Sequence, residues 1–94
     1  MLNISVGDDG TVHLKGRFDG SHAEEARDVF LDVRRTCVVN FSELDYISSA
    51  GLGVLLEAQQ RLQSTGHELQ LRNMNRHTRM VFELAGFDAI FKIE

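Results

Sequence analysis

The sequence predicts an α/β fold, with a mixed β-sheet of about four to five strands packed against α-helices. Apolar and polar residues alternate near the N-terminus, which indicates two paired strands, and strand-like and helix-like segments then alternate to the end of the chain. Strands separated by helices are joined by crossover connections, which favour parallel pairing. The expected order is β-β-α-β-α-β-α-β, in a single domain over residues 1–94.

The first two strands are expected to form a hairpin. Leu2, Ile4 and Val6 alternate with polar residues, and segment 12–18 repeats this pattern. The intervening Gly7-Asp-Asp-Gly10 is a turn signal.

The first helix is expected to follow Asp19-Gly20, with Ser21 and Glu24 forming a capping box. Its apolar face comprises Ala23, Ala26, Val29, Phe30 and Val33. The continuously apolar Cys37-Val-Val39 then predicts a central strand covered on both sides.

The second helix is expected to follow segment 46–53, YISSAGLG, and to end near Gly66. Its inward face is expected to comprise Leu52, Leu55, Leu56, Gln59 and Leu62. The residues expected to point outward are Glu57, Gln60, Arg61 and Gln63.

The last third of the chain predicts a strand, a helix and a final edge strand. Leu69 and Leu71 mark the strand, Asn75 is a plausible N-cap, and Gly86 closes the helix. The inward residues of this helix are expected to be Met80, Val81, Leu84 and Ala85. The edge strand is expected to contain Ala89, Phe91 and Ile93.

Composition excludes several classes of protein. With a net charge of -4 and no basic cluster, the chain is not expected to bind nucleic acid or an anionic membrane. The only cysteine, Cys37, excludes an intrachain disulfide and is expected to be a buried thiol. No signal peptide is evident and no stretch approaches the roughly 20 apolar residues of a membrane span, so a cytoplasmic protein is expected.

Segment 46–53 is the strongest functional candidate because it lies where a central strand is followed by a helix. Ser48 or Ser49 can cap that helix. A cap leaves Gly51 and Gly53 unexplained, because glycine in a helix costs about 1 kcal/mol relative to alanine. Close approach of another group is the usual reason for such glycines.

Catalytic and cofactor sites have little support. The first glycine of the hydrolase motif Gly-x-Ser-x-Gly is missing around Ser49, and none of the 4 histidines stands out as a base. Gly51-Leu-Gly53 lacks the lysine and spacing of a phosphate-binding loop. No residues stand at a metal-ligand spacing. Neither an enzyme nor a cofactor or metal is therefore expected.

Phosphorylation is the remaining interpretation. The free amides and dipole of a helix N-terminus tolerate a phosphoserine. The added charge of about -2 would oppose a partner docked at the same surface. Such a serine would act as a switch at an interface.

The segments VVNFSELDYISSAGLGVLLEAQQRL and GHELQLRNMNRHTRMVFELAGFDAIF resemble the STAS domain of bacterial anti-sigma factor antagonists. The family pattern runs from a strand through an Asp-Ser-Ser/Thr-Gly-Leu-Gly loop to a helix, a strand and a helix ending in Leu-x-Gly-Leu/Phe. Gly16-Arg-Phe-Asp19 is similar to the family's Gly-x-Leu-Asp. The resemblance implies a STAS fold whose final C-terminal helix is absent or shortened here.

The resemblance also implies partners and a switch. The partner would be an anti-sigma factor that is a serine kinase of the histidine-kinase-like ATPase fold, and a PP2C-type phosphatase would reset the protein. The phosphoacceptor falls on Ser49, with Ser48 as an alternative. The implied partner-binding residues are Asp19, Gly20, Ser21, Ser48, Ala50, Gly51 and Gly53.

The chain departs from the family pattern at three positions. Ser48 replaces the usual Asp before the acceptor, Ala50 replaces the usual Ser or Thr after it, and Asn40 stands where an acidic residue is common. These departures leave a second reading open, in which the domain is a binding module without phosphorylation, such as a transporter accessory subunit or a signalling scaffold.

Overall fold

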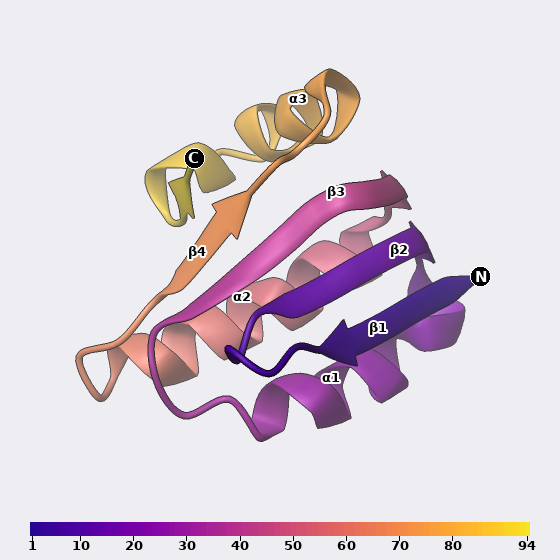
Figure 1. The fold of residues 1–94 in the computed structure, drawn as a ribbon. Helices are drawn as coiled ribbons and strands as arrows, with labels where there is room; N and C mark the ends of the chain where they lie inside the picture. Colours follow the sequence, from indigo (N-terminus) through magenta and orange to yellow (C-terminus); the bar gives the residue numbers. More distant parts are fainter.

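A computed structural model describes residues 1–94 and contains one five-stranded sheet with the order β1-β2-β3-β4-β5 (Figure 1). β1 and β2 are antiparallel, and the later neighbours are parallel. The predicted mixed sheet is therefore confirmed. The strands are β1 Leu2–Val6, β2 Val12–Phe18, β3 Cys37–Ile47, β4 Leu69–Arg72 and β5 Lys92–Ile93.

The helices are α1 Ala23–Leu31, α2 Ser49–Gln63 and α3 Arg76–Leu84, with 3-10 turns η1 at Gly20–His22 and η2 at Phe87–Ala89. In Figure 1, α1 and α2 lie side by side behind the sheet, and α3 lies apart from them, above β3. None of these helices has the length and apolar character needed to cross a membrane. Within residues 1–94, η2 and the short β5 follow α3.

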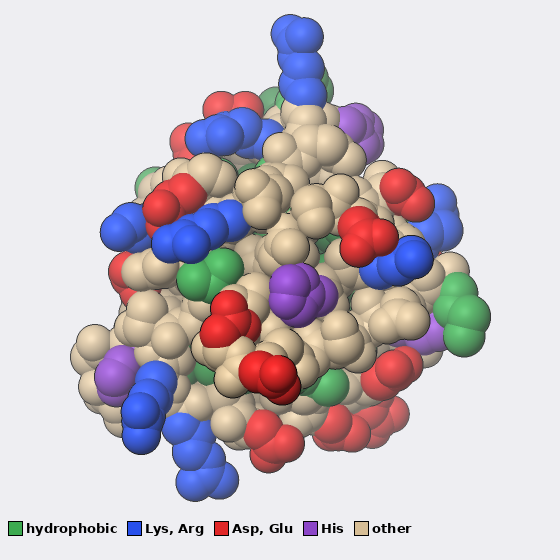
Figure 2. All heavy atoms as spheres, in the orientation of Figure 1, with side chains coloured by type: hydrophobic (Ala, Val, Ile, Leu, Met, Phe, Trp, Pro, Cys, Tyr) green, Lys and Arg blue, Asp and Glu red, His purple; other side chains and the backbone are tan.

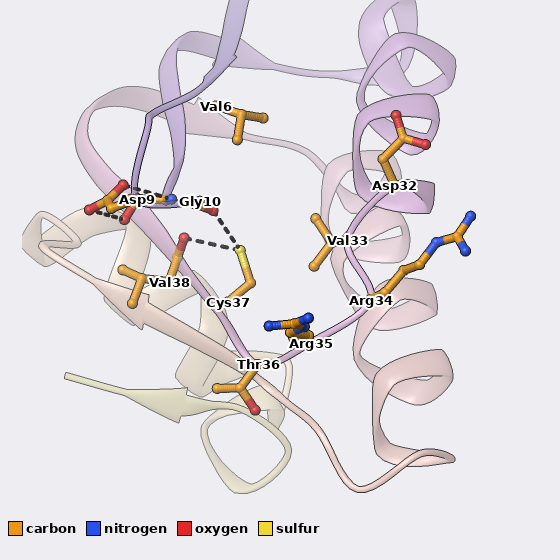
Figure 3. Close-up of a pocket in the computed structure, with 11 residues that line it drawn as sticks. Val6, Asp9, Gly10, Asp32, Val33, Arg34, Arg35, Thr36, Cys37 and Val38 are labelled. Atoms are coloured by element: carbon orange, nitrogen blue, oxygen red, sulfur yellow. Dashed lines mark hydrogen bonds between the residues drawn. The ribbon is translucent and has the colours of Figure 1, made fainter.

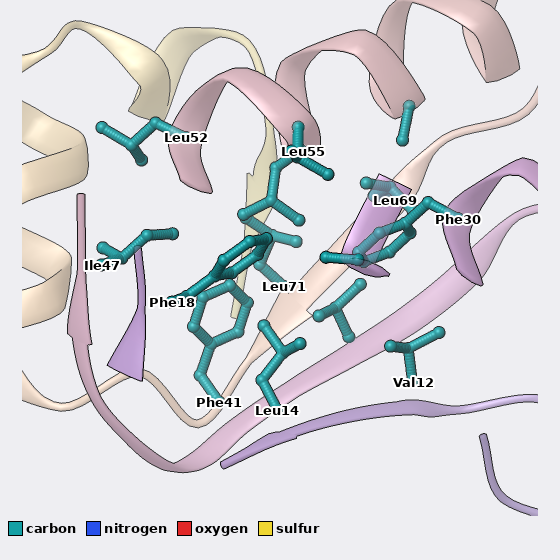
Figure 4. Packing of buried hydrophobic residues seen from close by; sticks show 14 of the residues in the cluster. Val12, Leu14, Phe18, Phe30, Phe41, Ile47, Leu52, Leu55, Leu69 and Leu71 are labelled. Carbon is teal, nitrogen blue, oxygen red and sulfur yellow. The ribbon is translucent and has the colours of Figure 1, made fainter. Parts of the chain in front are cut away.

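The core lies between the sheet and the α1–α2 layer. Alternate residues of β2 and β3 point into it and meet Phe30 of α1 and Leu55 of α2 (Figure 4). Phe82 of α3 closes one side of the core by packing edge-on against Phe41 of β3, with ring centroids 5.9 Å apart. The strand residues buried there include Val12, Leu14, Phe18, Val39, Phe41, Leu69 and Leu71.

The prediction that the central strand is covered on both sides is wrong. β3 continues from Cys37 to Ile47, and its residues alternate between buried and accessible positions. The accessible side belongs to the open face of the sheet, where charged side chains and histidine lie at the surface (Figure 2). Helices α1 and α2 cover the opposite face only, so this sheet has a single apolar side.

The start of α1 also differs from the prediction. The Asp19 carboxylate accepts hydrogen bonds from the Ser21 backbone N–H at 3.1 Å and from its hydroxyl at 2.6 Å. Because the Ser21 hydroxyl is engaged with Asp19, the capping box with Glu24 does not form, and residues 20–22 adopt a 3-10 turn. Helix α1 then begins at Ala23 without a side-chain cap.

Helix α3 buries a different face from the one predicted. Asn75 caps it as expected, accepting a hydrogen bond from Thr78 N at 2.7 Å. Thr78 and Phe82 are buried, whereas Met80 and Leu84 are 47% and 83% exposed. Phe82 sets this rotation, because its ring packs against three other phenylalanines. Of the predicted inward residues, Val81 is half-buried and Ala85 is exposed.

The inward face of α2 is confirmed for Leu52, Leu55, Gln59 and Leu62, while Leu56 is half-buried. Arg61 was predicted to point outward, but it is half-buried. The glycine stops are confirmed, since Gly66 and Gly86 have φ of 81° and 75°. The predicted edge strand is confirmed at residues 92–93, whereas Ala89 belongs to η2.

Candidate functional site

The predicted site residues gather at the end of the sheet where the carboxyl ends of β2 and β3 lie. The parallel register places Phe18 beside Ile47, so both strands leave the sheet at the same place. The backbone N–H of Ser48 donates a hydrogen bond to Phe18 O at 2.9 Å, which links the ends of β2 and β3. A Cβ at Gly20 would lie 3.8 Å from the Ala50 Cβ, so η1 and the start of α2 are in contact. The structure therefore brings segments 19–21 and 48–51 together.

Ser48 is the N-cap of α2. Its backbone is extended, with φ of -93° and ψ of 174°, and its Oγ accepts a hydrogen bond from Gly51 N at 3.3 Å. The side chain is half-buried. The Ser48 hydroxyl is thus engaged in holding the first turn of the helix.

Ser49 is the first residue of α2 and is exposed. Its hydroxyl makes no hydrogen bond within the protein, unlike the hydroxyl of Ser48. The first turn of α2 carries no acidic side chain, and its first amides face outward, as at the start of any helix. A free hydroxyl thus lies beside a surface that stabilises negative charge.

The two glycines of the loop have different surroundings. Gly51 is buried, and a Cβ there would lie 2.8 Å from both Phe18 O and Ile47 Cγ1. The close approach that Gly51 permits within the protein is therefore between α2 and the ends of β2 and β3. A Cβ on Gly53 would meet nothing within 4 Å.

Asp19 shapes the neighbouring turn. Its hydrogen bonds from the Ser21 hydroxyl and backbone stabilise the charged carboxylate and lower the pKa of Asp19 below its usual range. The carboxylate thus remains an anion beside the start of α2. Gly20 and Ser21 are exposed at the same turn.

Two contacts were not predicted, one at the ends of β2 and β3 and one between the two helices. The Arg17 guanidinium lies over the Tyr46 ring, 4.2 Å from its centroid. Arg27 of α1 donates to Glu57 of α2 at 2.8 Å, above a cavity of about 180 Å³ between the two helices. Each pair joins residues of two different elements, so the hydrophobic periodicity of either element alone does not predict it.

A larger cavity, of about 430 Å³, lies at the opposite end of the sheet. It is bounded by the turn between β1 and β2 and by the loop between α1 and β3 (Figure 3). Cys37 lines it and is buried as predicted, with its Sγ donating to Gly10 O at 3.4 Å. Burial raises the pKa of the Cys37 thiol, which opposes formation of the reactive thiolate.

No histidine forms a hydrogen bond with Ser48 or Ser49, and His22, in the adjacent turn, instead lies 3.5 Å from Glu25. No group of three His, Cys, Asp or Glu side chains is placed to hold a metal ion.

Comparison with known proteins places the chain among STAS domains. The family model described as "Mlab, STAS domain" matches residues 4–93. The "Putative anti-sigma factor antagonist BtrV" of Bordetella bronchiseptica is 44% identical over 59 residues, which cover 63% of this chain and 51% of that relative. The match thus spans about half of the length of BtrV.

Solved structures agree on the fold. The anti-sigma factor antagonist SpoIIAA of Bacillus, in its unphosphorylated form, has a TM-score of 0.75 at 22% identity, covering 100% of this chain and 88% of SpoIIAA. An anti-sigma factor antagonist from Mycobacterium paratuberculosis has a TM-score of 0.82 at 19% identity, covering 99% and 83%. SpoIIAA has also been solved in a phosphorylated form.

Proposed function

Because the chain belongs to the STAS domain family, we propose that it is an anti-sigma factor antagonist that acts by partner switching. The whole chain would act as a single domain. In the unphosphorylated form it binds an anti-sigma factor, which is also a serine kinase of the histidine-kinase-like ATPase fold. Binding releases the target of that anti-sigma factor, and the protein is itself not an enzyme.

The switch is phosphorylation of Ser49, and the observation that carries it is the difference between the two adjacent serines. Ser48 Oγ is engaged with Gly51 N, whereas the Ser49 hydroxyl is exposed and has no partner within the protein. A kinase can reach Ser49 without opening the helix cap. Ser48 is the alternative acceptor, but its phosphorylation would break the helix cap.

The partner surface surrounds the acceptor. Asp19, Gly20 and Ser21 flank it on one side, and Ala50 and Gly53 continue it along α2. Gly51 contributes by holding the start of α2 against Phe18, and Ser48 by capping the helix. A phosphate on Ser49 would bring about -2 charges to this surface. The start of α2 would tolerate them, but a partner seated over Ser49 and the Asp19 carboxylate would be repelled. A PP2C-type phosphatase would restore binding.

A second function is a STAS binding module that is not phosphorylated, either a transporter accessory subunit or a signalling scaffold. Ser48 and Ala50 favour it, because they replace the residues that usually flank the acceptor.

The decisive experiment incubates the protein with its cognate kinase and radiolabelled ATP. We expect Ser49→Ala to abolish phosphate incorporation while keeping kinase binding, and Ser49→Asp to abolish incorporation and weaken binding. Ser42→Ala is the matched control, since Ser42 is an exposed serine of β3.

Full incorporation into Ser49→Ala would move the acceptor to Ser48. No incorporation into the wild-type protein, together with binding to a transporter subunit, would support the unphosphorylated module instead.

A further inference from the structure

The cavity of about 430 Å³ lies at the end of the sheet where β3 begins. Its walls are the turn between β1 and β2 and the loop of residues 32–36 between α1 and β3 (Figure 3). The volume falls within the range of roughly 300 to 1,000 Å³ that is usual for small-molecule sites. Ser49 follows the other end of β3, so a molecule in this cavity would leave the proposed partner surface free.

Apolar side chains from three segments line this cavity. Val6 ends β1, Val33 follows α1 and Cys37 begins β3, and Figure 3 shows the three around the same hollow. Val6 is 56% exposed and Val33 is half-buried, so both keep contact with water in the free protein. Covering these side chains with an apolar group would be favourable. The cavity therefore suits a ligand with an apolar body.

Two acidic residues also line the cavity, but neither directs a free carboxylate into it. The Asp9 carboxylate already accepts hydrogen bonds from Thr11 N at 3.0 Å and from the Thr11 hydroxyl at 3.1 Å. The Asp32 carboxylate points away from Cys37 in Figure 3. A cationic ligand would therefore find no free anion in the cavity. A ligand with two negative charges would be opposed by Asp9, Asp32 and the neighbouring Asp8.

Arg35 supplies a positive charge at the cavity. Its side chain lies beside Cys37 and Thr36 in Figure 3, whereas Arg34 extends away from Cys37. The Arg35 guanidinium forms no ion pair within the protein. The backbone N–H groups of Arg34 and Arg35 also donate to no backbone carbonyl. The loop thus carries a free guanidinium, with unused amide donors next to it in the chain.

We propose that this cavity binds a small monocarboxylate with an apolar body. The planar guanidinium of Arg35 would hold the carboxylate through two parallel hydrogen bonds, which is the geometry that carboxylates favour. The apolar body would lie against Val6, Val33 and Cys37. A single negative charge matches one free guanidinium and avoids the repulsion that the nearby carboxylates would exert on a dianion.

Titration of the ¹⁵N-labelled protein, followed by the chemical shifts of its backbone amides, tests this site. Phenylacetate is the probe, and phenylacetamide, which has the same ring without the charge, is the matched ligand. We expect phenylacetate to cause saturable shifts at Gly10, Val33 and Cys37, and phenylacetamide to bind about tenfold more weakly or less. Inorganic phosphate, which has no apolar body, is expected to cause no saturable shift there.

Two pairs of variants test the charge and the apolar wall separately. Arg35→Gln is expected to weaken phenylacetate binding about tenfold or more, whereas Arg79→Gln, at an exposed arginine of α3, should leave it unchanged. Val6→Trp places a large side chain at the cavity from an exposed position and is expected to abolish binding. Val6→Ile is its control and is expected to keep binding. Circular dichroism and thermal unfolding establish that each variant is folded.

Three results would overturn the proposal. The first is the absence of saturable shifts around the cavity with phenylacetate. The second is equal affinity for phenylacetate and either phenylacetamide or phosphate, because the site would then not select an apolar monocarboxylate. The third is a folded Arg35→Gln or Val6→Trp variant that binds phenylacetate as tightly as the wild type.

Discussion

Gly51 shows at the scale of one residue how packing and function share the same loop. It lies in the first turn of α2, and a Cβ there would come within 2.8 Å of Phe18 O and 3.0 Å of Phe18 Cγ. We expect Gly51→Ala to lower the free energy of unfolding by about 1 to 2 kcal/mol, because overpacking outweighs the gain in helix propensity. Urea unfolding measures this change.

Gly53→Ala is the matched control in the same helix. A Cβ at Gly53 has no neighbour within 4 Å. Only the helix propensity changes, so the variant is expected to gain up to about 1 kcal/mol. Equal effects at the two glycines would contradict the close packing of Gly51 against β2 and β3.

At the scale of elements, Arg61 links helices α1 and α2. Its guanidinium donates to Val33 O at 2.9 Å and to Phe30 O at 2.5 Å, so α2 holds the carboxyl end of α1. We expect Arg61→Met to lower the free energy of unfolding by about 2 kcal/mol, because these hydrogen bonds to a charged donor are lost. Arg79→Met is the control, since Arg79 is exposed on α3 and forms no ion pair. A loss of the same size in both variants would show that Arg61 acts only through its alkyl chain.

Arg61 also shows which parts of the elements could be predicted from sequence. The alternation in β1 and β2, the Asn75 cap and the glycine stops are signals within one segment, and each was confirmed. The face that α3 buries depends on Phe41, which is distant in sequence from Phe82, and on Phe91, which lies outside the helix. Arg61 meets α1 for a similar reason, so its role could not be predicted from the periodicity of α2 alone.

The same distinction applies to the candidate site. Loop residues 48–51 were found from their local motif, and the parallel register of β2 and β3 places Asp19 beside them. The different surroundings of Gly51 and Gly53 could not be predicted, because they depend on the ends of β2 and β3. The assignment of the helix cap to Ser48 could not be predicted either, because either serine can start a helix.

At the scale of the whole molecule, stability is expected to depend on acid pH through carboxylates held at turns. The Asp9 carboxylate accepts hydrogen bonds from Thr11 N at 3.0 Å and from its hydroxyl at 3.1 Å, and these bonds lower the pKa of Asp9 below its usual range. The folded protein therefore binds fewer protons than the unfolded chain as the pH falls. The resulting stabilisation is present above the unfolded pKa of about 4 and is lost as the pH falls through the lower folded value.

Replacement of Asp9 tests this dependence in the turn between β1 and β2. Asp9→Ala is expected to unfold at a lower urea concentration than the wild type at neutral pH, because the turn loses both hydrogen bonds from Thr11. The difference should shrink as the pH falls below about 4, where the wild-type carboxylate becomes protonated. Asp8→Ala removes the same charge from the same turn but no hydrogen bond, so it separates the local contacts from the effect of net charge. Parallel pH profiles for the two variants would show that net charge alone governs the acid limb. If the stability difference from the wild type changes with pH only in Asp9→Ala, the loss of stability at acid pH arises from the hydrogen bonds of the turn.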